Sequence, residues 1–433
     1  MTPQSGFFVL APIVPAREAE LRRLLASMNE APGRVKANND IIPFAQFDRL
    51  HMARLLILDD KTVGDNQAYG LPRPSYPLYL GFLGDVDGEG DRFLEEVAAR
   101  APAGVRALFS CCEGFDAQTD PVAWMKAHAS RSSASYVNWR GRTVRRIREG
   151  AALHDALEAY VERAAPELRR LPPLGVHARL RELVEGDVAA GKLTLSPEEP
   201  TPLGWRIRNL LHLVGVPLVL LLLSPLLLAI AIVFAVRLRR LERSDPELCS
   251  RQDPALGAEL ALIEDHDVSN QFSAMGSLKP GLVRLWTTRL VLMAIDYAAR
   301  HVYTRGRLAR VRTIHFARWV FIAGSRRVMF ASNYDASLES YMDDFINKVG
   351  FGLNVVFSNG IGYPRARWLI LDGCRDERKF KEYLRRHQMP TQVWYKAYPG
   401  LTAADLERHV RIREGFESAS MSERGARDWV ALL

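Results

Sequence analysis

Residues 210–236 form the feature that most constrains the fold, because these 27 consecutive residues contain no Asp, Glu, Lys or Arg. A single helix of this length would extend about 40 Å at roughly 1.5 Å per residue, and the hydrocarbon core of a bilayer is roughly 30 Å thick. Uncharged runs of this length are rare in the cores of soluble proteins. The sequence therefore predicts a membrane segment with soluble parts before and after it.

Two prolines inside this run, Pro217 and Pro225, limit how it can enter a bilayer. A proline within a helix removes a backbone hydrogen bond and bends the axis, and two full crossings would need about forty residues. The segment is therefore either one tilted crossing or a re-entrant hairpin that leaves by the face it entered. Arginines flank the run on both sides, which favours a cytoplasmic location for both ends.

The composition favours a lipid surface as the partner. The chain has 433 residues and a formal charge of +8, so it is long enough for two domains of ordinary size. No nucleic-acid-reading motif is present, and anionic lipid headgroups suit a basic chain with a membrane segment. P-loop, HExxH, nucleophile-elbow and dinucleotide motifs are also missing from the sequence. The cysteines have neither zinc-site nor disulfide-framework spacing, which favours a reducing cytoplasm; they are Cys111, Cys112, Cys249 and Cys374.

The first 150 residues alternate apolar strands with amphipathic helices. Residues 7–14, 47–60 and 76–85 have the composition of strands, and residues 17–28 and 91–101 have helical spacing of their apolar side chains. A fourth strand is expected at residues 105–114. The resulting order, βαββαβ, is that of a ferredoxin-like unit.

The second half of the chain repeats sequence blocks of the first half. HMAR at 51–54 matches HFAR at 315–318, residues 92–115 align with 340–363 at one fixed offset, and RIREG at 146–150 recurs at 411–415. Three matches in the same order predict an internal duplication. The second unit is expected to open with a strand at 268–281 and a helix at 282–303. Arg289 and Asp296 argue against a membrane span in that helix.

These patterns predict an α+β fold in which two ferredoxin-like units pair as an α+β barrel, with a hydrophobic membrane segment between them. The expected organisation is a first unit at 1–150, a helical linker at 151–200, a membrane segment at 201–243, a connector at 244–265 and a second unit at 266–433. Strands that are apolar on both faces need a second covering layer. Pairing of the units requires both on one side of the bilayer, which favours the hairpin and places both units in the bacterial cytoplasm. A single crossing would require each half to pair within an oligomer.

The duplicated plan with its HxAR strands resembles the dimeric α+β barrel superfamily, which includes dye-decolourising peroxidases and chlorite dismutases. The second half, from IHFARWVFI to VRIREG, is also similar to a group of bacterial membrane-attached proteins. The peroxidase resemblance implies a GxxDG motif, which residues 84–88 spell, and a proximal haem histidine, for which His409 is the candidate. Glycine-aspartate turns also arise at ordinary strand ends, and residues 332–336 of the second repeat lack the glycines. Haem and no cofactor both remain open.

The repeated strands supply the candidate catalytic residues. Alternate residues of a strand face opposite ways, so one residue of each His/Arg pair should face the space between the units. There a histidine would transfer protons and an arginine would hold an anion. A buried histidine or arginine needs a partner, which could be a ligand carboxylate or a neighbouring acid such as Asp335 or Asp87. The alternative to a catalytic role is that the pairs fix strand register through internal hydrogen bonds. The candidate catalytic residues are His51, Arg54, His315, Arg318 and Asp335.

Basic residues near the membrane segment are candidates for lipid binding. Each basic residue near an anionic surface contributes about 1 kcal/mol to binding, and tryptophan suits the interfacial level. For residues 139–148 the alternative is a solvated basic face. The predicted lipid-binding residues are Trp139, Arg140, Arg142, Arg145, Arg146, Arg148, Arg237, Arg239 and Arg240.

Two functions follow from this reasoning. The first is a membrane-attached protein whose barrel pocket binds a lipophilic small molecule or lipid-derived substrate, with peroxidase-like redox chemistry as one candidate activity. The second is a non-enzymatic membrane-bound scaffold or adaptor with a solid barrel core. An interior filled by side chains, with His51 and His315 bonded internally, would favour the scaffold.

Overall fold

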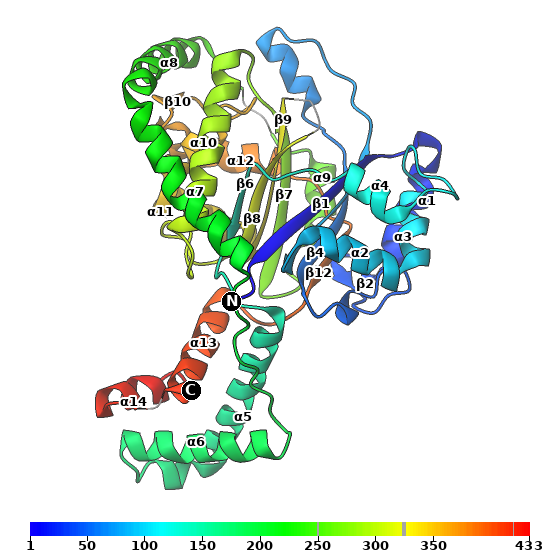
Figure 1. Cartoon of the computed structure of the whole chain (residues 1–433). Helices are drawn as coiled ribbons and strands as arrows, with labels where there is room; N and C mark the ends of the chain where they lie inside the picture. Colours follow the sequence, from blue (N-terminus) through cyan, green and yellow to red (C-terminus); the bar gives the residue numbers. More distant parts are fainter. Residues whose placement is uncertain (249–250, 323–325, 419) are drawn as a thin grey trace.

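A computed structural model of the chain describes residues 1–248, 251–322, 326–418 and 420–433. The fold is mixed α+β with antiparallel sheets (Figure 1). Of the described residues, 51% are helix and 19% strand. The strands are β1 (Gln4–Pro12), β2 (Asn29–Ala31), β3 (Arg34–Val35), β4 (Leu50–Leu58), β5 (Tyr79–Asp87), β6 (Ala134–Val137), β7 (Ser269–Ser277), β8 (Ile314–Phe321), β9 (Arg327–Asp335), β10 (Ala366–Arg367), β11 (Leu371–Asp372) and β12 (Val393–Lys396).

Most helices cover the outer faces of the sheets. The others form two extensions, one made of α5, α6, α13 and α14 and the other of α7 and α8. The helices are α1 (Glu18–Ser27), α2 (Gly90–Arg100), α3 (Pro102–Phe109), α4 (Pro121–Ala127), α5 (Val144–Leu168), α6 (Pro173–Ala189), α7 (Leu203–Leu222), α8 (Ser224–Ser244), α9 (Pro254–Ala261), α10 (Leu282–His301), α11 (Leu338–Phe357), α12 (Glu377–His387), α13 (Ala403–Glu417) and α14 (Glu423–Val430).

Two four-stranded antiparallel sheets lie at the centre of the molecule, with strand orders β1-β5-β4-β12 and β6-β8-β9-β7. Each sheet takes three strands from one half of the chain and its fourth strand from the other half. Trp394 of β12 lies opposite Arg54 of β4, and Ser135 of β6 lies opposite Arg318 of β8. The two halves are therefore joined through both sheets.

The sheets pack face to face through apolar side chains. Leu56 and Leu58 of β4 belong to the cluster between the sheets, together with Val320 and Met329 of the second sheet. Their neighbours Leu55 and Ile57 belong instead to the core beneath the helices, because successive side chains of a strand point to opposite faces. This arrangement explains why these strands are apolar on both sides.

The prediction of a strand at residues 105–114 is wrong. Residues Pro102–Phe109 form helix α3, in which Val105, Leu108 and Phe109 are buried at helical spacing, and proline at the first position favours the start of a helix. The aligned block in the second half lies in helix α11 and the turn after it. The fourth strand of the first half is instead the short β6, which pairs with β8 of the second half.

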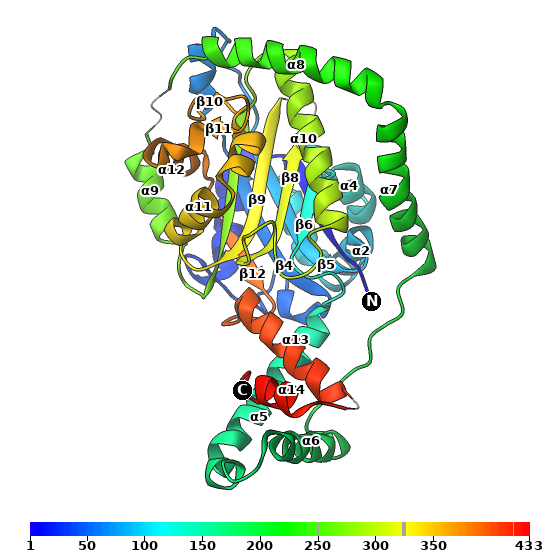
Figure 2. The same cartoon turned by 90° about the vertical axis from the view of Figure 1, so that its left-hand side faces the viewer.

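A helical tail of α5, α6, α13 and α14 extends below the sheets (Figures 1 and 2). Its core includes Leu153, Leu157, Ile412 and Trp429. Helix α5 begins at Val144, so the helical linker predicted from residue 151 starts earlier and packs against α13 of the second half.

The long apolar run forms two helices that meet at Leu223, and we call residues 203–244 the arch. Pro225 lies in the first turn of α8, where a proline is tolerated, whereas Pro217 lies inside α7 without ending it. Figure 2 shows α7 along one side of the body and α8 across its top. By length and composition alone, α7 is the one helix of the described residues that could cross a membrane.

Both ends of the arch are fixed to the same body. Before α7, Glu199 accepts hydrogen bonds from Thr2 and from Arg145. At the end of α8, the Glu242 carboxylate accepts the backbone N–H groups of Trp368 (2.8 Å) and Leu369 (2.7 Å). The segment therefore returns to the body from which it departs.

Candidate functional site

Two buried histidine–aspartate pairs lie at corresponding ends of the two sheets. Nε2 of His51 is 3.0 Å from Oδ1 of Asp87, and Nε2 of His315 is 2.6 Å from Oδ1 of Asp335. Both histidines are 1% exposed. Burial, the largest effect, lowers the pKa of His315, and contact with the Asp335 carboxylate offsets part of this shift.

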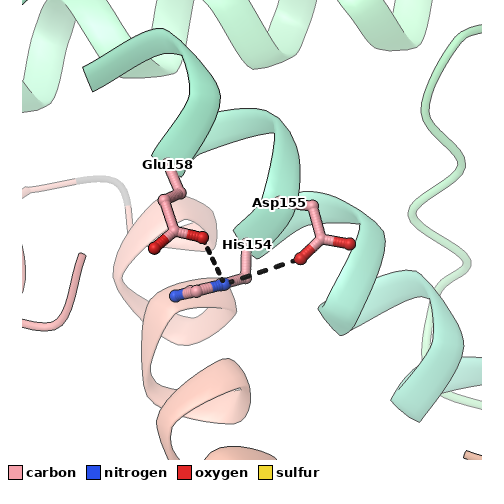
Figure 3. A group of neighbouring side chains, drawn as sticks. All are labelled: His154, Asp155 and Glu158. Atoms are coloured by element: carbon pink, nitrogen blue, oxygen red, sulfur yellow. Dashed lines mark ion pairs between the residues drawn. The ribbon is translucent and has the colours of Figure 1, made fainter. Parts of the chain in front are cut away.

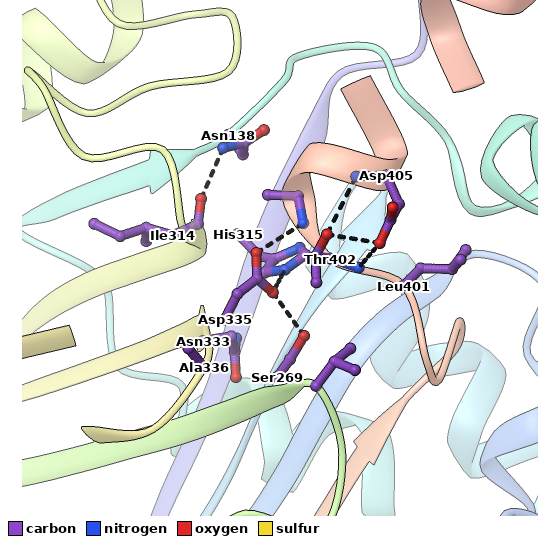
Figure 4. Close-up of polar contacts among 12 residues, drawn as sticks. Asn138, Ser269, Ile314, His315, Asn333, Asp335, Ala336, Leu401, Thr402 and Asp405 are labelled. Atoms are coloured by element: carbon purple, nitrogen blue, oxygen red, sulfur yellow. Dashed lines mark hydrogen bonds and ion pairs between the residues drawn. The ribbon is translucent and has the colours of Figure 1, made fainter. Parts of the chain in front are cut away.

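Each aspartate of these pairs also holds the first turn of a helix. Asp335 accepts hydrogen bonds from the backbone N–H of Ala403 and from Oγ of Ser269, both at 2.7 Å (Figure 4). Asp87 accepts from the backbone N–H of Val144 at 2.9 Å. Burial alone would raise the pKa of Asp335, but the charge and hydrogen bond of His315 bring it below its usual value. These contacts attach α13 and α5 to the strand ends.

Both histidines reach the space between the two halves. Simple alternation of side chains along a strand would have placed only one residue of each His/Arg pair there. The register of β4 shifts between Leu50 and Met52, and that of β8 shifts between Ile314 and Phe316. A bulge redirects the side chain at the shifted position. His51 and His315 consequently line one void of about 10 Å³, which has space for about one water molecule.

Arg54 and Arg318 cross between the sheets in opposite directions. Arg54 donates to the backbone oxygens of Phe272 (2.9 Å) and Ser332 (3.0 Å), and burial lowers its pKa to about 9. Arg318 donates to the backbone oxygens of Phe7 (2.7 Å) and Gly84 (2.8 Å).

The two arginines differ in charge partner. Arg318 forms an ion pair with the Asp85 carboxylate, whereas the corresponding contact of Arg54 is to the neutral amide of Asn333. A Cβ at Gly6 would lie 2.5 Å from Nη2 of Arg318, so the absence of a side chain at this position leaves room for the guanidinium. The void beside the two arginines is about 10 Å³. The predicted catalytic residues thus have internal partners, and among them His315 and Asp335 are bonded to each other. The described residues leave no chamber between them, only the two small voids.

An apolar cavity of about 240 Å³ lies elsewhere, between the outer face of the second sheet, α10 and α11. Its wall includes Phe272 and Trp319 from the sheet, Ile295 from α10, and Leu353 and Phe357 from α11. An apolar cavity of roughly 150 Å³ stays dry and accepts a benzene ring. The larger volume and apolar lining suit a hydrocarbon ring or chain.

A break in α11 accompanies this cavity. Val349 has non-helical dihedral angles (φ −144°, ψ 29°), and Gly350 and Gly352 follow it. Sequence reasoning missed the site, although two glycines within an apolar helical pattern are a sign of a packing or functional demand. A second void of about 50 Å³ shares Phe272 and Trp319 with the cavity.

The predicted lipid-binding residues divide into two groups. Arg142 is buried, donates to Oδ1 of Asn138 at 3.1 Å, and therefore does not face a lipid surface. Three neighbouring arginines form ion pairs: Arg145 with Glu199 (3.0 Å), Arg146 with Glu198 (3.7 Å) and Arg148 with Asp48 (3.5 Å). Trp139 and Arg140 are half-buried, and Arg140 donates to the backbone oxygen of Ala299.

The second group lies at the end of the arch. Arg237 and Arg240 are exposed and line a shallow hollow of about 370 Å³ with Ser244 and Val283. Arg239 forms an ion pair with Glu242 at 3.0 Å. Arg237 and Arg240 are thus accessible to an anionic surface, as is the side chain of Arg145, which is 51% exposed beside Glu199.

The haem candidate His409 lies in the helical tail. Its ring packs 4.8 Å from that of His154, and burial together with the charge of His154 lowers the pKa of His409 to about 4. The two aspartates of the GxxDG sequence are already bonded, Asp85 to Arg318 and Asp87 to His51. The voids beside Asp85 and His51 are about 10 Å³ each, whereas ligand pockets generally measure roughly 300–1,000 Å³. The described residues near these groups therefore do not fit haem.

His154 also belongs to a small group of polar side chains on α5. Its Nδ1 lies 3.8 Å from a carboxylate oxygen of Asp155 and 3.9 Å from one of Glu158 (Figure 3). The three ligand atoms lie within 4.8 Å of one another, but both carboxylates are exposed. Exposed acids on one helical turn beside a histidine do not by themselves define a metal site.

Comparisons with protein-family models, with curated proteins and with solved structures each found no match. The resemblance to the dimeric α+β barrel superfamily therefore remains a prediction from sequence.

Proposed function

We propose that this protein attaches to one face of a bilayer and binds a lipophilic molecule, such as a lipid chain, in the cavity between α10, α11 and the second sheet. One observation carries the proposal: the wall of this apolar cavity includes Phe351, whose side chain is 65% exposed. The cavity therefore reaches the surface. Its helices α10 and α11 lie on the same side of the molecule as the arch (Figure 1).

The exposed side chains of the arch support attachment to a bilayer. Leucines along both helices are highly exposed, for example Leu221 (70%) in α7 and Leu228 (65%) in α8. Contiguous apolar surfaces of this extent mark membrane or protein interaction sites. Helix α10 adds an exposed stripe that includes Leu282, Trp286 and Met293. The arch and this stripe would together form the lipid-facing side.

The shared sheets support a monotopic arrangement. Because β12 pairs with β4 and β6 pairs with β8, neither half can lie across a bilayer from the other. We take the structure to be two duplicated ferredoxin-like units with exchanged fourth strands and an inserted membrane-surface segment. Arg237 and Arg240 would then meet anionic headgroups on the cytoplasmic face.

The filled space between the sheets argues against catalysis at the predicted residues. The histidine–aspartate pairs and the two arginines have internal partners, which favours their structural role. We therefore place the ligand site in the outer cavity and not in the barrel interior predicted from the sequence. A scaffold without a ligand is the second candidate function, and the solid interior between the sheets is the observation that favours it.

Mass spectrometry of lipids that copurify with the protein tests the proposal. Gly352 lines the cavity, and the nearest heavy atom to an added Cβ there would be Cβ of Val349, at 4.0 Å. Gly352→Phe should therefore fill the cavity without a backbone clash. The wild-type protein, purified in detergent, is expected to carry close to one chain-bearing lipid per molecule, and Gly352→Phe at least tenfold less.

Gly186→Phe in α6 is the matched control, because a Cβ at Gly186 would meet no heavy atom within 4 Å. This variant should retain the wild-type amount of lipid. Equal lipid content in wild-type protein and Gly352→Phe would reject the cavity as the binding site and favour the scaffold.

A further inference from the structure

The turn that follows α10 joins the wall of the apolar cavity to a cluster of positive charge. Leu308 and Ala309 line the cavity. In the sequence Arg307 precedes and Arg310 follows these two residues, and both arginines are exposed. Residues 304–312 contain four arginines and no aspartate or glutamate.

Two backbone hydrogen bonds close this turn beside the cavity. The backbone N–H of Leu308 donates to the oxygen of Val311 at 2.9 Å, and the N–H of Val311 donates to the oxygen of Leu308 at 3.0 Å. Ala309 has φ +53°, which non-glycine residues rarely adopt outside tight turns. The two hydrogen bonds hold Ala309 against the cavity and leave Arg310 at the exposed tip.

The arginines of the turn lack internal partners that would neutralise them. Within the described ranges, Arg307, Arg310 and Arg312 form no ion pair or hydrogen bond, in contrast to Arg145, Arg146 and Arg148. Arg305 lies over the Trp139 ring at 5.8 Å. One acid, Glu407, lies beside this segment, with its carboxylate 3.4 Å from the position of a Cβ at Gly306. The surface beside the cavity wall is therefore basic.

We infer that the ligand is an anionic amphiphile whose hydrocarbon chain occupies the cavity and whose carboxylate or phosphate head pairs with Arg307 and Arg310. This inference rests on the proposed function and adds the chemical class of the ligand. Guanidinium groups bind carboxylates and phosphates through paired hydrogen bonds. A neutral head of the same chain length would leave both arginines in water, and a cationic head would be repelled.

Photocrosslinking with a chain-labelled probe tests the inference. The full-length protein is placed in phosphatidylcholine nanodiscs and labelled with hexadecanoate that carries a diazirine in its chain. Peptide mapping should place the label on α11 and β9. Competition is then measured with four unlabelled compounds of the same chain length: hexadecanoate, hexadecyl phosphate, hexadecanol and hexadecyltrimethylammonium.

The expected result is that an anionic competitor acts at least tenfold more strongly than hexadecanol, and that the cationic compound is weakest. The order of hexadecanoate and hexadecyl phosphate shows which anionic head is preferred. In the double variant Arg307→Gln/Arg310→Gln, the advantage of the anionic heads should fall below threefold while competition by hexadecanol is unchanged. The control Arg424→Gln/Arg427→Gln changes two exposed arginines of α14 and should behave as wild type.

Two outcomes separate this inference from the proposed function. Equal competition by hexadecanoate and hexadecanol, or a preference for anions that survives the double variant, would overturn the assignment of the head while leaving the chain site intact. Label that appears only on the arch, and that persists in Gly352→Phe, would overturn the chain site itself and the inference with it.

Discussion

Replacing Arg318 with alanine is expected to lower the free energy of unfolding by about 3–5 kcal/mol. The change removes the donors to the backbone oxygens of Phe7 and Gly84 and leaves the buried Asp85 carboxylate without its positive partner. An unpaired buried charge costs far more than an unpaired neutral group. Denaturant unfolding followed by tryptophan fluorescence measures the effect in detergent.

Three further variants test whether the loss of stability comes from the buried ion pair of Arg318 and Asp85. Arg54→Ala should destabilise less than Arg318→Ala, because the contacts of Arg54 are to neutral oxygens. Adding Asp85→Asn to Arg318→Ala should recover part of the loss, since the residue left behind is then uncharged. Arg424→Ala on the surface of α14 should change the free energy of unfolding by less than about 0.5 kcal/mol. Equal stability of the Arg318 and Arg424 variants would contradict a structural role for the repeated arginine.

Charged substitutions in the arch are expected to release the protein from membranes. Lysine in place of Leu221 and Leu228 puts a charge on each helix of the arch. A lysine costs about 2.5–3.5 kcal/mol at the centre of a membrane helix and less near the interface. The double variant should therefore bind vesicles at least tenfold more weakly, as measured by flotation with phosphatidylcholine and phosphatidylglycerol.

The matched control is Val188→Lys in α6, where an apolar residue is also exposed but lies in the helical tail. This variant should float with the vesicles as wild type does. Unchanged flotation of the double arch variant, or wild-type protein that stays in solution without detergent or lipid, would contradict attachment through the arch.

Local sequence patterns were sufficient to predict most elements of the sheets. The apolar run at 47–60 contains β4, and the runs at 7–14 and 76–85 overlap most of β1 and β5. The block expected to open the second unit contains β7 followed by α10. The suggestion that neighbouring acids would bond the repeated histidines is confirmed by Asp87 and Asp335. These features follow from periodicity and from the cost of burying an unpaired polar group.

The features that depend on tertiary contacts could not be predicted. Strands β6 and β12 contain four residues each, too few for a pattern that identifies the partner sheet. The bulges at His51 and His315 reverse the alternation that placed histidine and arginine on opposite faces. The outer cavity depends on the break at Val349 and on the packing of α10 against the second sheet. The arginines of residues 304–312 lie beside this cavity only in the folded chain, so the sequence pattern alone did not connect them with a ligand site.

A crystal structure of the protein with dibrominated octadecanoate would show whether a lipid chain occupies the cavity, because bromine can be located by its anomalous scattering. We expect bromine peaks inside the cavity bounded by Trp319, Phe330 and Leu353, and none there in Gly352→Phe. Bromine found only along the arch, with the cavity filled by side chains, would contradict the claim that this protein holds a lipid chain.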